Sequence, residues 1–113
     1  MQKVSVVIPN YNGMQYIERC LESLKRQSFQ EFETIFVDNG SEDGSVAYVR
    51  ERFPWVRLIC LAENTGFCRA VNVGIRESRG EYVVLLNNDT EVEAEFLKAL
   101  YDGIRAKENA FSC

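Results

Sequence analysis

The sequence predicts one α/β domain built on a parallel β-sheet with helices on both of its faces. Four short apolar runs have the length and composition of buried strands, and each is followed by a segment with helical spacing of apolar residues. Continuous apolar strands that alternate with amphipathic helices are typical of parallel sheets covered on two sides. With 113 residues, 46% hydrophobic and 27% charged, the whole chain 1–113 is expected to be a single domain.

The first strand–helix unit opens the chain. Residues 4–8 form a β-branched run, and a buried strand that ends at Pro9 is expected there. Residues 9–13 have the composition of a loop. A helix is expected over residues 14–27, because apolar side chains recur there three and four positions apart, at Ile17, Cys20, Leu21 and Leu24.

The second unit has the same order of elements. Residues 34–37 are expected to form a buried strand that ends at Asp38, and the turn-forming residues 39–44 follow it. A helix is then expected to begin near Ser45 and to be ended by Pro54. Its apolar face consists of Val46, Val49 and Phe53.

The second half of the chain repeats the alternation twice. Strands are expected over residues 56–61 and 82–86, each followed by a polar turn. The helix after the first of these strands is expected to bury a stripe of Phe67, Val71, Gly74 and Ile75 and to be closed by Arg79 and Gly80. A last helix is expected over residues 93–107, and residues 108–113 carry no helical pattern.

This order places the polar loops together. Right-handed crossovers put every loop that follows a strand along one edge of a parallel sheet. In a sheet of order 3-2-1-4, the strand order reverses between the first and fourth strands, and ligands bind at such a point. The loops expected to meet there are residues 9–13 and 87–90, with Asp38 one strand away.

Asp89 is the sharpest candidate for a functional residue. It stands at the end of a predicted buried strand, next to Asn87 and Asn88. Carboxylate and amide oxygens are hard ligands, and Mg²⁺ and Mn²⁺ bound to few protein ligands keep positions open for phosphate oxygens and water. The alternative is a strand-end turn, in which these side chains only satisfy backbone groups of the loop.

Four further residues have a functional and a structural interpretation each. Asp38 accepts the ring N–H of a pyrimidine or guanine base, or it anchors the turn that follows. Tyr11 stacks on a base, or it packs on its neighbours. Asn64 lies before a helix N-terminus, where it contacts phosphate or caps the helix. Arg69, in the first turn of that helix, bridges phosphate oxygens or is solvated.

The charge and cysteine content exclude several classes of protein. A net charge of -4 with 13 scattered Lys and Arg residues argues against a nucleic-acid binder, which needs a basic patch. The chain has no histidine, and its 4 cysteines lack CxxC spacing, which argues against a zinc site. Cys20 and Cys60 lie in apolar periodic segments and are expected to be buried thiols, a pattern that fits a reducing, cytoplasmic setting. Its longest apolar runs are about five residues, far short of the ~20 that span a bilayer.

Several blocks of the sequence, in order, resemble the opening of family 2 glycosyltransferases. Each block alone is weakly specific, but together they are in register from residue 4 to about residue 100. The blocks are 4–13 (VSVVIPNYNG), 37–45 (VDNGSEDGS), 63–67 (ENTGF), 72–75 (NVGI), 80–82 (GEY) and 85–90 (LLNNDT).

The resemblance implies a Rossmann-like half-domain of the glycosyltransferase A-type fold. It also implies that a sugar is transferred from a nucleotide-diphosphate donor with inversion at the anomeric carbon. By their positions in the blocks, Pro9 and Tyr11 would border the base of the donor, and Asp38 would accept the N–H of that base.

At the other end of the donor, the resemblance implies that Asn87 and Asn88 lie near the ribose and diphosphate and that Asp89 binds a divalent cation, Mg²⁺ or Mn²⁺. These residues stand in the place of the family's DxD motif, with Asn87 replacing the first Asp. A subgroup that looks rhamnosyltransferase-like shares this departure, which favours a dTDP- or UDP-sugar. Val71 stands where many members carry an arginine, and whether Arg69 substitutes for it stays open.

Members of this family continue into an acceptor-binding half with a catalytic Asp or Glu. No residue after the 85–90 block matches that base, so it is expected beyond residue 113, and the chain is interpreted as a donor-binding portion, inactive in isolation. The expected acceptor is a glycan or lipid-linked sugar in polysaccharide biosynthesis, with at most peripheral contact at the inner face of the cell membrane. The alternative is a non-catalytic nucleotide-binding or interaction module, in which the unpaired edge of the fourth strand favours a homodimer.

Overall fold

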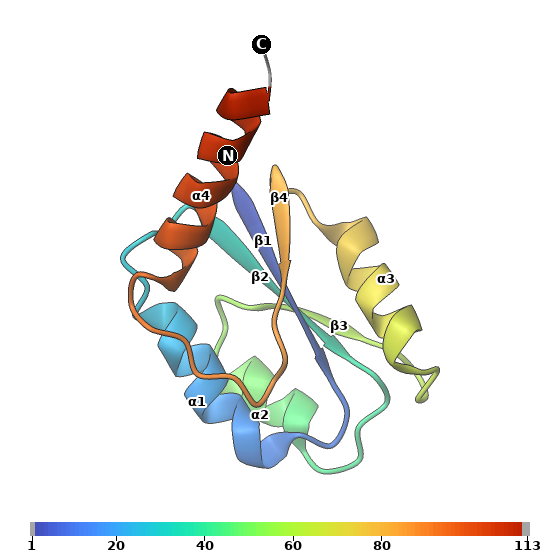
Figure 1. Cartoon of the computed structure of the whole chain (residues 1–113). Coiled ribbons are helices and arrows are strands. Elements are labelled where there is room, and N and C mark those ends of the chain that lie inside the picture. Colours follow the sequence, from blue (N-terminus) through green and yellow to red (C-terminus); the bar gives the residue numbers. More distant parts are fainter. Residues whose placement is uncertain (1, 112–113) are drawn as a thin grey trace.

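The computed structural model describes residues 2–111, with side chains through residue 107, and contains a four-stranded parallel sheet in the order β3-β2-β1-β4 (Figure 1). Strands and helices alternate along the chain as predicted. Their bounds are β1 Val4–Asn10, α1 Met14–Lys25, β2 Phe32–Asp38, α2 Ser45–Arg52, β3 Arg57–Cys60, α3 Phe67–Glu77, β4 Tyr82–Leu85 and α4 Phe96–Phe111. The predicted fold class and strand order are therefore confirmed.

Two layers of helices cover the sheet, as expected. On one face, α1, α2 and α4 enclose the main core, which includes Ile17, Leu21, Phe36, Val49 and Leu97. On the other face, α3 lies alone over β1 and β2 (Figure 1). None of the helices within residues 2–111 is long and apolar enough to cross a membrane.

The first strand is longer than predicted, because it continues through Pro9 to Asn10. The expectation that Pro9 ends it was wrong, and hydrogen-bond geometry gives the reason. Val7 points its carbonyl toward β4 and accepts the Leu86 N–H at 2.9 Å. Pro9, two residues later, faces the same side, where β4 has already ended at Leu85, so the ladder needs no N–H there.

Helix α3 presents a different face to the sheet than predicted. Ala70 and Gly74 are its buried residues, while Phe67 and Ile75 are 57% and 46% exposed. A Cβ on Gly74 would lie 2.3 Å from Val7 Cγ1, so this glycine lets the helix approach β1 closely. Because α3 covers β1 and β2 rather than β4, one face of β4 is left open there. The predicted stripe was therefore wrong at its two large residues.

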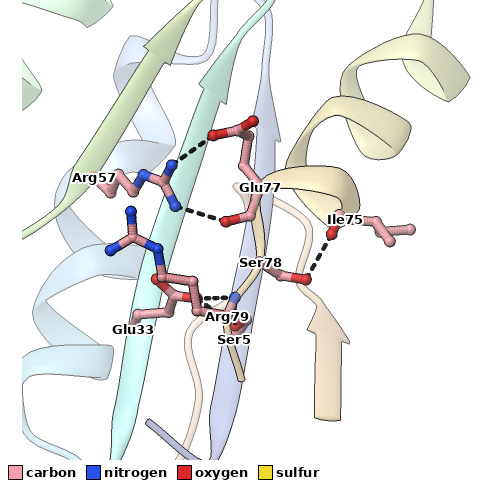
Figure 2. Close-up of polar contacts among 7 residues, drawn as sticks. All are labelled: Ser5, Glu33, Arg57, Ile75, Glu77, Ser78 and Arg79. Carbon is pink, nitrogen blue, oxygen red and sulfur yellow. Dashed lines mark hydrogen bonds and ion pairs between the residues drawn. The ribbon is translucent and has the colours of Figure 1, made fainter. Parts of the chain in front are cut away.

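Hydrogen bonds hold the connection from α3 to β4 against β1, β2 and β3 (Figure 2). Arg57 of β3 donates from Nη1 to the Glu77 carbonyl at 2.6 Å and from Nη2 to the Glu77 carboxylate at 2.5 Å. The backbone N–H of Arg79 donates to Glu33 Oε2 at 2.6 Å and to Ser5 Oγ at 3.2 Å. These contacts fix where β4 begins, at the edge of the sheet opposite to the polar loops.

The last helix begins three residues later than predicted and continues past residue 107 to Phe111. Residues 90–95 therefore form a loop between β4 and α4, rather than the first turn of the helix. This loop runs beside α1 and follows Asp89 directly, so its position bears on the candidate site.

Candidate functional site

A cavity of about 360 Å³ lies at the carboxyl edge of the sheet, between the ends of β1 and β4 and the start of α3. Most of the residues predicted for the site line it, namely Pro9, Tyr11, Asn64, Asn87, Asn88 and Asp89. Four residues that were not predicted line it too, namely Asn10, Asn39, Phe67 and Ala70. Asp38 and Arg69 are not in its lining. The polar strand ends thus meet where the strand order reverses, as ligand sites do in parallel sheets.

Asn10, the last residue of β1, joins the ends of three strands. Its Nδ2 donates to Asp38 Oδ1 of β2 at 2.9 Å, and its Oδ1 accepts from Asn88 Nδ2, which follows β4, at 2.7 Å. Asn10 is only 2% exposed, so both bonds lie in a largely dry environment. Asn10 was predicted to lie in the loop of residues 9–13 and was not predicted as a site residue. The available signal was a polar residue at the end of the central strand.

Gly13 makes room for this link. A Cβ at this position would lie 2.1 Å from Asn88 Nδ2 and 2.4 Å from Asn10 Oδ1, the two atoms of the hydrogen bond. Contacts this close do not occur between a real Cβ and its neighbours. Any larger residue at position 13 must therefore displace the Asn88 side chain or the loop.

Asp38 is buried beneath the cavity, with 1% of its surface exposed. Its Oδ1 accepts from Asn10 and its Oδ2 accepts from the Ser41 N–H at 2.9 Å. Of the two interpretations of Asp38, these bonds correspond to the anchor of the turn. The Asp38 carboxylate also holds the side chain of Asn10, which lines the cavity, so Asp38 affects the cavity indirectly.

Asn39 holds the loop before α3 against the end of β2. Its Nδ2 donates to Asn64 Oδ1 at 3.0 Å and to the Gly66 carbonyl at 3.1 Å. Its Oδ1 accepts from the Thr65 N–H at 3.0 Å and from Thr65 Oγ1 at 3.3 Å. At Gly40, φ is +80° and a Cβ would lie 2.6 Å from the Glu63 backbone, so the tight packing of the two loops also requires glycine.

The loops after β1 and β2 are bound to each other. The Asn12 N–H donates to Ser41 Oγ at 2.8 Å, and Asp43 accepts from the Met14 and Ser45 N–H groups at 3.0 Å each. Asp43 thereby satisfies a backbone N–H group in the first turn of α1 and another in the first turn of α2. Burial raises the pKa of the Asp43 carboxyl, but hydrogen bonds from the Ser45 side chain and from backbone N–H groups outweigh it and hold the pKa below its ordinary value.

The segment 87–89 forms a turn that lines the cavity, with Asn87 and Asp89 exposed and Asn88 half-buried. The Thr90 N–H donates to the Asn87 carbonyl at 3.1 Å. Within the described part of the chain, the Asp89 side chain makes no hydrogen bond or ion pair. The amide oxygens of Asn87 and Asn88 also have no donor there. Three consecutive residues thus carry hard oxygen ligands without a donor in the described part of the chain, which the turn interpretation alone does not require.

A buried thiol lies under this turn. Cys20 of α1 is 1% exposed, and its Sγ lies 3.9 Å from the Asn87 carbonyl oxygen, to which it donates. Burial, together with the negative charge of Asp89, raises the pKa of the Cys20 thiol to about 12. The thiol therefore stays protonated near neutral pH and supports the turn as a weak donor.

Two polar residues of α1 hold the loop that follows Asp89. Ser23 Oγ accepts from the Val92 N–H at 3.2 Å. Gln27 Nε2 donates to the Glu93 carbonyl at 2.6 Å, and its Oε1 accepts from the Leu97 N–H at 3.0 Å. The Gln27 side chain is 3% exposed. Gln27 was predicted only as the end of a helix, because hydrogen-bond partners about 70 residues away leave no local pattern in the sequence.

Among the residues that the structure describes, no lysine or arginine lines the cavity. Arg69, one candidate for a phosphate contact, is exposed on α3, which fits the solvated alternative. No group of three or more His, Cys, Asp or Glu residues able to hold a metal occurs among the described residues. The residues present fit a divalent cation that takes one carboxylate and amide oxygens from the chain and its other ligands from phosphate and water. A nucleoside diphosphate would bring those phosphate oxygens.

The chain is similar to known glycosyltransferases in sequence. The family model described as "Glycosyl transferase family 2" matches residues 5–113. The glycosyltransferase GlyG of Streptococcus pneumoniae serotype 4 is 32% identical over 109 residues, which cover 93% of this chain and 36% of GlyG.

Solved structures are similar as well. S. aureus TarS 1–349 in complex with UDP-GlcNAc matches with a TM-score of 0.84 and 32% identity, over 93% of this chain and 32% of that chain. Mannosyltransferase PcManGT from Pyrobaculum calidifontis, in complex with GDP-Man and Mn²⁺, matches with a TM-score of 0.75 and 31% identity, over 86% and 30%. The chain therefore spans about a third of the length of these proteins.

Proposed function

The chain belongs to glycosyl transferase family 2, and on this premise we propose that its cavity between β1 and β4 binds a nucleoside-diphosphate sugar as the donor in an inverting sugar transfer. The observation that carries the proposal is the convergence of Tyr11, Asn88 and Asp89 on one cavity at the carboxyl edge of the sheet. These residues follow β1 and β4, two strands that are far apart in sequence but paired in the sheet, with Val4 opposite Tyr82. The chain would then be the donor-binding portion of a glycosyltransferase.

The proposed donor lies with its base toward Pro9, Tyr11 and Asn64 and with its diphosphate toward Asn87 and Asn88. Two similar structures support a nucleotide sugar in general, since TarS was solved with UDP-GlcNAc and PcManGT with GDP-Man. Asn87, in the place of the first Asp of the DxD motif, is the feature shared with the rhamnosyltransferase-like subgroup. It favours a dTDP- or UDP-sugar among these donors.

Asp89 is the proposed ligand of a divalent cation, Mg²⁺ or Mn²⁺. Its carboxylate has no partner within the described residues, and the cavity contains no cationic side chain that would balance a diphosphate. The structure of PcManGT with Mn²⁺ gives independent support for a metal in this fold. When bound, the cation offsets the negative charge that develops on the departing diphosphate. The amide oxygens of Asn87 and Asn88 would be available to it as further hard ligands.

The general base for the acceptor hydroxyl is proposed to lie outside these 113 residues. An inverting transfer needs a carboxylate that removes the acceptor proton as the oxygen attacks the anomeric carbon. Asp89 is the one acid that lines the cavity among the described residues, and it is assigned to the metal. The similar proteins are about three times as long, which supports an acceptor-binding half elsewhere in the polypeptide.

The proposed acceptor is a glycan or a lipid-linked sugar in polysaccharide biosynthesis. The reaction is placed in the cytoplasm, with at most peripheral contact at the inner face of the cell membrane. Cys20 is buried as expected, whereas the prediction that Cys60 is buried was wrong, since its thiol is exposed like that of Cys68. Free thiols of this kind fit a reducing compartment.

A second candidate function is a nucleotide-binding or interaction module without turnover. It is favoured by the open face of β4, where Val83 and Leu85 are 40% and 48% exposed on an edge strand, an arrangement that suits a homodimer. Sedimentation measurements over a range of concentrations and a sugar-transfer assay separate the two candidates. Transfer by the isolated chain would rule out the second one.

Calorimetric titration tests the donor site. UDP, dTDP and GDP are each titrated into the chain with and without Mn²⁺, and binding that requires the metal is expected for at least one of them. Asp89→Ala should abolish the dependence on metal, whereas Asp102→Ala, at an exposed acid of α4, should not alter it. Metal-independent binding, or no binding to the unmodified chain, would contradict the proposal.

A further inference from the structure

Phe67 is an aromatic residue that neither core of the fold uses. It is the first residue of α3, 57% of its surface is exposed, and it lines the cavity. Among the described residues, its ring stacks on no other aromatic ring. Tyr11, in the loop after β1, lines the same cavity and is 48% exposed. Two large rings from separate elements are therefore open toward one space.

Asp38 and Asn39, at the end of β2, are poorly placed to form hydrogen bonds to a ligand. Asp38 is buried outside the cavity lining, and each of its oxygens already accepts a hydrogen bond. Asn39 lines the cavity, but both of its amide hydrogens donate and its carbonyl oxygen accepts twice. A base that bonded to Asn39 would have to break a bond that holds a loop in place, and a base that bonded to Asp38 would have to displace the groups that bury this carboxylate. Such an exchange gains little free energy.

Asn64, which also lines the cavity, has a side-chain donor that remains available. Asn64 Oδ1 accepts from Asn39 Nδ2 at 3.0 Å and from the Gly66 N–H at 2.9 Å. Its own Nδ2 has no acceptor within the described residues and is on an exposed side chain. An amide donor of this kind suits a ring carbonyl, which uracil, thymine and guanine all carry. This single contact does not distinguish among the three bases.

From these observations we infer that Phe67 is a second aromatic contact for the donor base, and that stacking on Tyr11 and Phe67, rather than hydrogen bonding to Asp38, holds the base. The inference rests on the proposed function and specifies how its site recognises the nucleoside. Stacking tolerates any base, because every base has a π-face. Any preference of the chain for UDP or dTDP over GDP is therefore expected to stay within about tenfold, since a contact that only one base can make is missing.

The test compares variants of α3 by calorimetry with UDP in the presence of Mn²⁺. Loss of one base–aromatic stack corresponds to a rise in Kd of roughly 5- to 150-fold. Phe67→Ala is expected to show a rise in this range for UDP, dTDP and GDP alike, and Phe67→Tyr, which retains a ring, to stay near the parent. Ile75→Ala is the matched control, because Ile75 is an exposed apolar residue of the same helix outside the cavity lining. Its Kd should not change.

Inorganic pyrophosphate with Mn²⁺ separates the inference from the proposed function. Pyrophosphate has no base, so Phe67→Ala should leave its affinity unchanged while lowering that of UDP. Metal-dependent binding of UDP that is the same in Phe67→Ala and in the parent would overturn the inference and leave the proposed function intact. An equal loss of UDP and pyrophosphate affinity would also overturn it, since Phe67 would then act on the whole site. Absence of any nucleotide or pyrophosphate binding to the parent chain would refute both.

Discussion

Replacing Asn10 by alanine tests the hydrogen-bond network that aligns the candidate site. Asn10 is 2% exposed and connects the ends of β1, β2 and β4 through its side chain. Alanine retains the extended backbone and the Cβ but removes both the donor and the acceptor. Asp38 Oδ1 and Asn88 Nδ2 then lose their partners at once.

The expected loss of stability follows mainly from two bonds, because the third, from Asn10 Nδ2 to Ser41 Oγ, is long at 3.3 Å. The bond from Asn10 Nδ2 to the Asp38 carboxylate, at 2.9 Å, is of the charged kind, and the bond from Asn88 Nδ2 to Asn10 Oδ1, at 2.7 Å, is neutral. Bonds to a charged group contribute roughly 1.5–3 kcal/mol and neutral ones about 0.5–1.5 kcal/mol. The free energy of unfolding should therefore fall by about 2–4.5 kcal/mol, a large share of the ~5–15 kcal/mol that stabilises a domain.

Urea denaturation followed by circular dichroism measures this loss. Asn72→Ala is the matched control, because Asn72 is exposed on α3 and its side chain has no hydrogen bond among the described residues. The control should change the free energy of unfolding by less than about 0.7 kcal/mol, through helix propensity alone. If Asn10→Ala is no less stable than Asn72→Ala, the network does not stabilise the fold, and its alignment of the three strand ends is refuted.

Three further predictions concern residues that support the site. Because burial and the charge of Asp89 raise the pKa of Cys20 to about 12, iodoacetamide at neutral pH should label Cys60 and Cys68 but not Cys20 in the folded chain, as peptide mapping would show; labelling of all three at similar rates would contradict the burial. Gln27→Ala should lower the free energy of unfolding in urea by roughly 2–3 kcal/mol, because the Glu93 carbonyl and the Leu97 N–H lose their hydrogen-bond partner; a change below that of Asn72→Ala would count against it. The lowered pKa of Asp43 contributes stability above the ordinary aspartate pKa of about 3.9, and this is lost as pH falls through the lower folded-state value. Asp43→Asn should therefore reduce the decline in urea midpoint with acid, and an unchanged decline would show that other carboxylates cause it.

The fold was predictable because its signals are local. The spacing of Ile17, Cys20, Leu21 and Leu24 indicated a helix with one buried face, and all four are buried in the structure. The general rules of parallel sheets then supplied the strand order and the edge at which the loops meet. The error at Pro9 arose because the effect of a proline in a strand depends on whether the neighbouring strand still runs beside it.

The meeting of the polar residues at one edge of the sheet was predictable, but the hydrogen bonds that each of them makes were not. Asp38 and Asn39 are neighbours in sequence, yet one lies beneath the cavity and the other lines it. Which of them has hydrogen-bonding capacity left for a ligand depends on partners in other loops, and no local pattern specifies those. Phe67 illustrates the same point, since its apolar character predicted burial and the position of α3 over β1 and β2 left it open to the cavity.

The location of the metal tests the central claim most directly. A crystal of the chain with UDP and Mn²⁺, with data collected at a wavelength where manganese scatters anomalously, places the ion without reference to any model. We expect an anomalous peak at coordination distance from the Asp89 carboxylate and from the diphosphate, with the nucleotide in the cavity between β1 and β4. A nucleotide bound there with no manganese beside Asp89, or a nucleotide bound elsewhere on the chain, would contradict the account.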